Sequence, residues 1–214
     1  ASLPSKTFSV QLCLVETNEI FLLPQCHDNL ILEKLKSHLE LLAGIPFNFQ
    51  RLQYLDEADL ADESTFKDND IVPGGTITMR IWRHDGWGDL VAAAAKGETM
   101  KLAHLGITED FGGTTPHADL LGPEQKKEWV AHRAFVALFV ASHRGHVETV
   151  KFLLRHGADL HAKTPLGRTA LHGAVAAGQC GSLELLLSYG AQADTPDSEG
   201  QTGMSLARLW GQKQ

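Results

Sequence analysis

Eleven histidines are the side chains of this 214-residue sequence best suited to bind a metal ion or to transfer protons. His143 and His146 lie three residues apart, but Gly145 stands between them and is expected to end a helix there. No cysteine or carboxylate cluster adjoins them to complete the ligand set that a metal site requires. We therefore expect no bound metal, and we interpret His143 as a surface residue.

Three cysteines offer a second kind of chemistry. Cys13, Cys26 and Cys180 are widely separated, and they form neither a CxxC pair nor a disulfide framework. Apolar residues surround Cys180, which favours a buried and inert thiol over a nucleophile activated by a histidine. The lack of a disulfide framework favours a reducing compartment, the cytoplasm or the nucleus.

Paired carboxylates and phosphate-binding motifs would indicate an enzyme. Asp56-Glu57 and Asp62-Glu63 are such pairs, but both lie in an acidic, loop-like stretch, where a solvated surface is the simpler interpretation. The sequence contains no P-loop, no GxGxxG and no HExxH motif. We expect no cofactor and no catalytic activity, and an enzyme that uses residues 107–132 as a lid is the alternative.

Charge and hydropathy argue against two other classes of protein. The formal net charge is -7, and no basic stripe is present, so we expect no nucleic acid as a partner. The longest apolar runs, such as residues 134–141, are too short to span a bilayer. The N-terminus also lacks the apolar core of a secretory signal, so we expect no membrane partner.

The C-terminal part of the sequence repeats with a period of 33 residues. Gly145 and Gly178 are expected to end the first helix of each copy, because glycine adopts a positive φ most easily. Val147, Val150 and Leu153 recur at helical spacing and predict the apolar face of a second helix. The pairs that share the period include Leu138/Leu171, Leu153/Leu186, Leu154/Leu187, Gly157/Gly190, Ala158/Ala191 and Thr169/Thr202.

This period, with the segment Thr169-Ala170-Leu171-His172-Gly173-Ala174, is similar to that of ankyrin repeats. The resemblance implies an all-α solenoid over residues 84–214, and a hydrogen bond from His172 across the turn that opens its helix. Its predicted parts are a degenerate repeat at 85–106, an insertion at 107–132, repeats at 133–163 and 164–195, and a partial cap repeat at 196–211. In the insertion, a short helix is predicted to pack Trp129 inward, and an exposed anchor for a partner is the alternative.

Residues before the repeats alternate between apolar and polar side chains, as half-buried strands do. A run of leucines at helical spacing then predicts a helix, with Asp28 or Asn29 as its N-cap and Gly44 as its stop. The expected order is strand, strand, helix, strand and a last strand, and the clearest segments are 8–14, 19–23, 32–42 and 77–81.

The string Gly44-Ile45-Pro46-Phe47-Asn48-Phe49-Gln50-Arg51-Leu52 resembles a segment of ubiquitin, and residues 60–71 resemble its acidic loop. The resemblance implies an α+β ubiquitin-like β-grasp domain at 7–83. At the positions of ubiquitin's apolar recognition patch this chain has Gln53 and Arg80, and it continues without a terminal di-glycine. We therefore expect neither conjugation nor binding through that patch.

A ubiquitin-like domain joined to ankyrin repeats resembles a small vertebrate family. Trp82 and Trp87 flank a junction without a Gly/Ser-rich linker, so we expect the two units to pack rigidly. The combination predicts a non-catalytic scaffold or adaptor that binds a protein partner through the concave ankyrin surface. The predicted partner-binding residues are His143, Arg144, Arg168, Ser198 and Gln201.

Arg144 and Arg168 are expected to form charge-assisted hydrogen bonds with a partner carboxylate. The alternative is a ubiquitin-pathway adaptor that docks through residues 7–83. Neither the identity of the partner nor the oligomeric state follows from the sequence.

Overall fold

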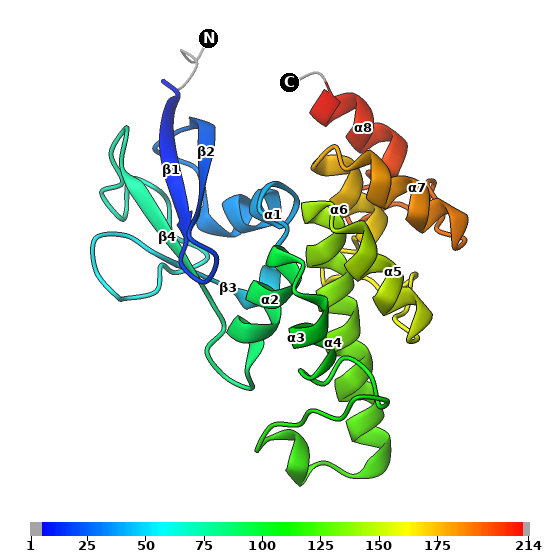
Figure 1. Ribbon diagram of the computed structural model, residues 1–214. Coiled ribbons are helices and arrows are strands. Elements are labelled where there is room, and N and C mark those ends of the chain that lie inside the picture. Colours follow the sequence, from blue (N-terminus) through cyan, green and yellow to red (C-terminus); the bar gives the residue numbers. More distant parts are fainter. Residues whose placement is uncertain (1–5, 212–214) are drawn as a thin grey trace.

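In the computed structural model, which describes residues 6–211, a four-stranded sheet lies beside a set of paired helices (Figure 1). The order across the sheet is β2-β1-β4-β3, in which β1 runs parallel to β4 and the other pairings are antiparallel. One helix and a short 3₁₀ turn precede β3, so the predicted order of elements is confirmed. The elements of this sheet unit (residues 8–81) are β1 (Phe8–Leu14), β2 (Glu19–Cys26), α1 (Leu32–Leu42), η1 (Phe47–Phe49), β3 (Gln50–Gln53) and β4 (Thr76–Ile81).

The core of the sheet unit follows from the alternation of apolar residues along its strands and from the helical spacing of leucines along α1. Val10, Leu12 and Leu14 alternate along β1 and are buried, while Leu35 and Leu39 of α1 lie in the same apolar cluster. Each such side chain contributes roughly 1.5–3 kcal/mol when it leaves water. The sheet is therefore half-covered, with α1 on one face and polar residues on much of the other.

The first turn of α1 is held by the loop between β3 and β4. The N–H groups of Leu32 and Glu33 donate to carbonyl oxygens of that loop at 2.9 and 2.8 Å. The prediction of Asp28 or Asn29 as the N-cap is wrong, because a segment distant in sequence satisfies these donors. The predicted stop is consistent with the structure: α1 ends at Leu42, and Gly44 has a φ of +70°.

Within residues 6–211, seven further α-helices follow the sheet unit, and we name them together the repeat helices. The first helices of the pairs, α2, α4, α6 and α8, pack against one another in that order, and α3, α5 and α7 contact them. Gly145 and Gly178 have φ values of +77° and +68° just beyond α4 and α6, as the repeat pattern predicted. The repeat helices are α2 (Trp87–Lys96), α3 (Thr99–Ala103), α4 (Pro123–Arg144), α5 (Val147–Arg155), α6 (Ala170–Ala176), α7 (Cys180–Ser188) and α8 (Gly203–Gly211).

None of the helices within residues 6–211 is long and apolar enough to cross a bilayer. Cys180 is exposed at the start of α7, so its predicted burial is wrong. The reason is that Cys180 and Gly181 lie on the solvent side of the first turn of α7, while Ser182 on its other side is buried.

The longest helix, α4, begins inside the predicted insertion. Pro123 lies in its first turn, where a missing N–H removes no helical hydrogen bond. Trp129 is buried, which confirms its inward packing, but it belongs to this long helix and not to a short one of its own. Figure 1 shows the first half of α4 extending beyond the other repeat helices, beside the loop that carries η2 (Ala118–Leu120).

The sheet unit and the repeat helices share a buried boundary. In Figure 1, α1 lies between the sheet and α6. Leu41 of α1 forms an apolar cluster with Ala176 of α6 and Leu206 of α8. At the chain junction, the rings of Phe49 and Trp87 lie 4.4 Å apart between centroids. These contacts support the expected rigid packing of the two units.

Candidate functional site

The last turn of α4 contacts the sheet unit through Arg144. Its Nε and Nη2 donate to the two carboxylate oxygens of Glu19 in β2, both at 2.9 Å. Its guanidinium carbon lies 5.6 Å from the ring centroid of Phe21. Burial opposes ionisation of Glu19, but the Arg144 hydrogen bonds outweigh it and lower the pKa of that carboxyl. Arg144 therefore binds a carboxylate in a two-pronged geometry, and this carboxylate belongs to its own chain.

His143 is covered by the C-terminal end of α1, and only 5% of its surface is exposed. Its Nε2 lies 2.7 Å from the carbonyl oxygen of Leu41, and Arg144 donates to its Nδ1 at 2.6 Å. A neutral ring that accepts at Nδ1 must donate at Nε2. Burial, and then the charge of Arg144, lower the pKa of His143 to about 3. The predicted surface position of His143 is wrong, because the sheet unit packs over it.

Arg168, in the loop between α5 and α6, is 2% exposed and lies in a buried charge network. Its Nε donates to Asp197 at 3.1 Å, and its Nη1 donates to the carbonyl oxygen of Ser37 at 2.6 Å. The same Nη1 lies 3.6 Å from Glu40 of α1. The network therefore joins α1 to the loops that precede α6 and α8.

Glu40 has no exposed surface, and its oxygens are satisfied from both units. It accepts from the hydroxyl of Thr164 and from the N–H of Phe47, each at 2.6 Å. Burial raises the pKa of Glu40, although these hydrogen bonds and Arg168 favour its charged form. A buried carboxylate with this set of donors positions α1 on the repeats.

The five predicted partner-binding residues thus fall into two groups. His143, Arg144 and Arg168 lie against the sheet unit, whereas Ser198 is exposed and Gln201 is half-buried in the loop before α8. The backbone carbonyl of Gln201 lies 3.1 Å from Nε2 of His172, whose Nδ1 accepts from the N–H of Thr169 as the ankyrin resemblance implied. The sheet unit of the same chain therefore covers part of the surface that the sequence assigned to an external partner.

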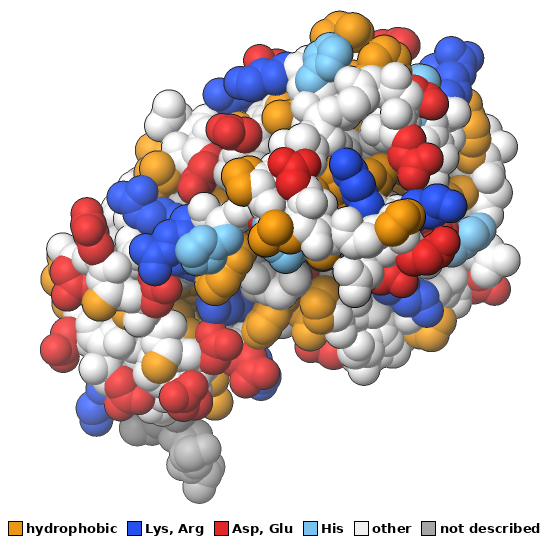
Figure 2. Space-filling view, turned by 90° about the horizontal axis from the view of Figure 1, so that it is seen from below, with side chains coloured by type: hydrophobic (Ala, Val, Ile, Leu, Met, Phe, Trp, Pro, Cys, Tyr) orange, Lys and Arg blue, Asp and Glu red, His pale blue; other side chains and the backbone are white. Residues whose placement is uncertain are grey.

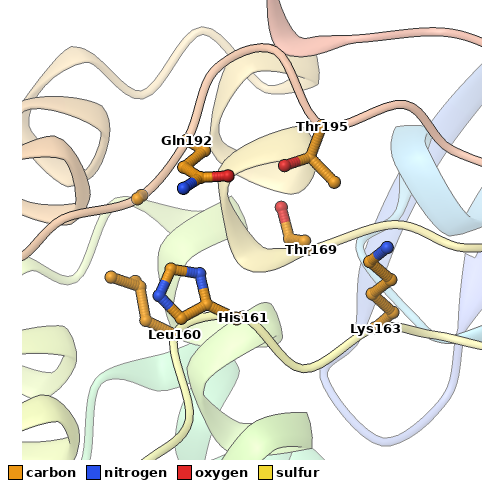
Figure 3. A pocket seen from close by; sticks show the side chains of 7 residues that line it. Leu160, His161, Lys163, Thr169, Gln192 and Thr195 are labelled. Atoms are coloured by element: carbon orange, nitrogen blue, oxygen red, sulfur yellow. The ribbon is translucent and has the colours of Figure 1, made fainter.

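A pocket of about 310 Å³ lies between the loops that follow α5 and α7 (Figure 3). The hydroxyls of Thr169 and Thr195 point toward the space between these loops, and Gln192 and His161 lie on either side of it. His161 and Lys163 are exposed at its rim. The lining offers hydrogen-bond donors and one fixed positive charge, which suit a polar or acidic segment of a partner.

A second cluster fixes the insertion at the junction of the two units. The guanidinium of Arg133 lies between two indoles, 5.0 Å from the centroid of Trp87 and 4.6 Å from that of Trp129. It donates to the carbonyl oxygens of Asp85 and Leu105 at 2.7 and 2.8 Å. Trp129 Nε1 donates to the Asp85 carboxylate at 2.7 Å. Burial lowers the pKa of Arg133, and its planar contacts explain how a cation is tolerated there.

The sheet face that would match ubiquitin's recognition patch is polar. Arg80 donates to the side-chain oxygen of Gln53 at 3.1 Å, and Gln53 donates to Asp59 at 2.9 Å. Arg51 also pairs with Asp59 at 3.2 Å. Figure 2 shows acidic side chains spread over the part of the molecule formed by the sheet unit, with Lys and Arg among them. Among residues 6–211, no three His, Cys, Asp or Glu side chains are grouped closely enough to hold a metal ion.

Sequence reasoning missed the three carboxylates that pair with the predicted arginines, which are Glu19, Glu40 and Asp197. Glu40 did leave a local signal, since a carboxylate stands between Leu39 and Leu41 in a leucine-rich helix. Glu19 left none, because a charged residue at the start of a hairpin strand is ordinary.

Comparison with known proteins agrees with the repeat architecture. Residues 90–197, about half of the chain, match the family described as ankyrin repeats (three copies). Human Ankyrin repeat and SOCS box protein 16 is 39% identical over 72 residues, which is 34% of this chain and 16% of that protein. Human Protein phosphatase 1 regulatory subunit 27 is 38% identical over 70 residues, 33% of this chain and 46% of that protein.

One relative extends over both units. Human Protein ANKUB1 is 22% identical over 188 residues, which cover 80% of this chain and 34% of that protein. The chain spans less than half the length of each of these three relatives. With the family match, the 33-residue period and the paired helices in agreement, the protein belongs to the ankyrin-repeat family.

Proposed function

We propose that this protein is a non-catalytic adaptor that binds a protein partner through the surface of its ankyrin repeats. The observation that carries the proposal is the polar rim between successive repeat loops, where His161, Lys163, Gln192 and Ser198 are exposed above an apolar repeat core. Repeat arrays use such extended surfaces for binding. The relative named as a regulatory subunit of protein phosphatase 1 supports a role exerted through another protein.

The binding surface we propose is narrower than the sequence prediction. His143, Arg144 and Arg168 already bind groups of the sheet unit, so a partner would contact the open loops, including Ser198 and Gln201. We further propose that the repeats form a solenoid and that the sheet unit is a ubiquitin-like β-grasp domain. The mixed sheet with one helix, and the relative that matches across both units, support this assignment.

The test begins with identification of partners by cross-linking to the purified full chain, followed by affinity measurement with each purified partner. Lys163→Glu with Ser198→Arg should weaken binding at least tenfold, because both changes act at the open loops. Lys127→Glu is the matched control, since Lys127 is exposed at the start of α4, away from these loops. A partner whose affinity responds equally to both variants would contradict the proposed surface. A chain without any saturable partner would contradict the function.

The ubiquitin-pathway alternative has less support. Its usual contact would be an apolar patch, and the corresponding side chains here, Gln53 and Arg80, bond to each other and to Asp59. Titration of a ubiquitin-receptor domain into the ¹⁵N-labelled chain would separate the two functions. Saturable shifts confined to β3 and β4 would favour this alternative over the adaptor of the open loops.

A further inference from the structure

β2 is an edge strand with backbone groups free to pair. In β1, the N–H groups of Gln11 and Val15 donate to carbonyl oxygens on the β4 side, so the backbone groups of residues 11 and 13 face β4. Their partners across the hairpin, Leu22 and Ile20, therefore direct their own N–H and C=O groups away from β1. Within residues 6–211 these four groups have no backbone partner.

The side chains beside this edge are apolar and exposed. Ile20 and Leu22 are 66% and 61% exposed on the face of the sheet away from α1. An exposed apolar edge is unusual, because strands that must not pair commonly carry charges there. The free edge ends at Pro24, which has no N–H, and a bulge shifts the register beside it.

A groove of about 490 Å³ runs along the same edge, between the sheet unit and the repeat helices. The sheet unit forms one wall with Phe21, Leu22 and Leu42, and the end of α6 forms the other with Ala176 and Ala177. In Figure 1, β2 is the strand of the hairpin that lies nearer to the repeat helices. Both walls are required, so the groove belongs to the assembled chain and not to either unit alone.

The charges at the floor of the groove are already neutralised. Arg144 is paired with Glu19 through two hydrogen bonds, and the ring of His143 is bonded to Leu41 and Arg144. An ionised side chain entering between these groups and the alanines would lose its hydration without gaining a free countercharge. At this floor the groove therefore favours an uncharged side chain, while His38 and Gln179 add polar groups elsewhere in its lining.

We infer that the groove binds an extended apolar peptide segment of a partner protein, which adds to the sheet as a strand beside β2. Its backbone pairs with Ile20 and Leu22, one set of its side chains enters the groove, and the alternate set packs on the exposed Ile20 and Leu22 side chains. One wall of the groove is the end of α6, at Ala176 and Ala177, so the segment we infer is a single extended strand that lies between β2 and that helix end. This site deepens the proposed adaptor function and rests on it.

The geometry is tested first by hydrogen exchange of the free protein. The amides of Ile20 and Leu22 should exchange much faster than those of Phe21 and Leu23, which pair with β1. Equal protection of all four amides would overturn the assignment of a free edge.

Binding is tested with a displayed library of random linear heptapeptides, selected on the full chain. Enriched peptides should carry β-branched or aromatic residues at alternate positions and no charge at the centre. Leu22→Pro should weaken them at least tenfold relative to Leu22→Ala, because it removes the outward N–H but no hydrogen bond to β1. Ala177→Trp should also abolish binding by filling the groove, whereas Ala131→Trp, on the exposed part of α4, should not.

Three other outcomes would contradict the binding of a partner peptide in this groove. A selection that enriches nothing, or enriches peptides that bind Ala177→Trp as tightly as wild type, overturns it. Self-association that Leu22→Pro abolishes would show that a second copy is the occupant. The adaptor function is tested separately, by the partners that cross-link at the open loops. A negative result for the groove therefore leaves that function untouched, and a negative result for the loops leaves the groove untouched.

Discussion

Gly44 shows how closely the two units approach at the level of single residues. It has a φ of +70°, and a Cβ placed on it would lie 2.4 Å from Cγ of His143 and 2.8 Å from Nη1 of Arg144. These two side chains are the ones that bind Leu41 and Glu19 across the boundary. The glycine therefore serves two purposes, ending α1 and admitting the last turn of α4.

Gly44→Ala should destabilise the protein by about 2–5 kcal/mol, the sum of about 1–2 kcal/mol for the left-handed backbone and about 1–3 kcal/mol for overpacking. Gly74→Ala is the matched control in the same unit, since Gly74 has a φ of +80° and nothing within 4 Å of its Cβ position. Gly74→Ala should therefore lose only about 1–2 kcal/mol, which arises from the left-handed backbone. Urea unfolding measures both changes, and equal losses would contradict the close approach.

His143 should make stability depend on pH. Its pKa falls from 6.5 to about 3 on folding, so between these values the unfolded chain binds a proton that the native chain does not. Stability is then complete above pH 6.5 and is lost as the pH falls toward 3, with a slope of at most about 1.4 kcal/mol per pH unit. His143→Gln keeps a donor for Leu41 but cannot titrate.

The measurement is the free energy of unfolding of wild type and His143→Gln between pH 7 and the onset of acid unfolding. The difference between the two proteins should shrink on acidification, because the wild type alone bears this cost. All other titrating groups, including Glu19 with its lowered pKa, are common to both. Parallel curves would show that folding does not lower the pKa of His143.

The sequence singled out Arg144 and Arg168, but it did not predict which groups they bind. The 33-residue period places Arg144 and Arg168 at positions where ankyrin side chains point away from the repeat core. Which surface covers them depends on a contact between residues more than a hundred positions apart, such as that between Glu40 and Thr164. Local periodicity carries no information about such a contact.

At the scale of elements, glycines and apolar periods predicted where helices end better than where they begin. α4 and α6 end just before or near a glycine with positive φ, because a left-handed residue is a local requirement. The beginnings of α1 and α4 depend on tertiary groups: a loop carbonyl holds Leu32, and Asp85 holds Trp129 six residues into α4. The predicted insertion at 107–132 therefore remains a prediction, and the sequence did not reveal that α4 runs through its end without a break.

The loop of the insertion should be released when its anchor is shortened. Trp129→Phe removes the hydrogen bond to Asp85 and replaces one of the two indoles that enclose Arg133 with a smaller ring. We expect proteolysis within residues 107–122 to accelerate at least tenfold, with little change in the rest of the chain. Trp82→Phe is the control, since Trp82 is 45% exposed and makes neither contact. Unchanged proteolysis in Trp129→Phe would show that the loop is held by other groups.

At the scale of the whole molecule, the sheet unit occupies part of the surface that repeat proteins offer to partners. It does so through apolar contacts, through the pair of Glu19 with Arg144, and through the network around Arg168. These contacts bury Glu40 and Arg168, each of which binds groups of both units. We therefore expect the two units to unfold in one transition, and the partner surface to consist of the loops and edges that the sheet unit leaves open.

The network around Arg168 provides the decisive test of that coupling. Arg168→Met keeps a long unbranched side chain but removes its charge, which leaves Glu40 and Asp197 buried without their cation. The free energy of unfolding should fall by about 3–5 kcal/mol. Adding Glu40→Gln removes one unpaired charge, so the double variant should lose less than the single one. Native-state hydrogen exchange should give the slowest amides of β1 and α6 one common free energy in the wild type, and both should fall together in Arg168→Met. If only the α6 value fell, the sheet unit would be an independent domain, and the boundary would be a docking contact that a partner could displace.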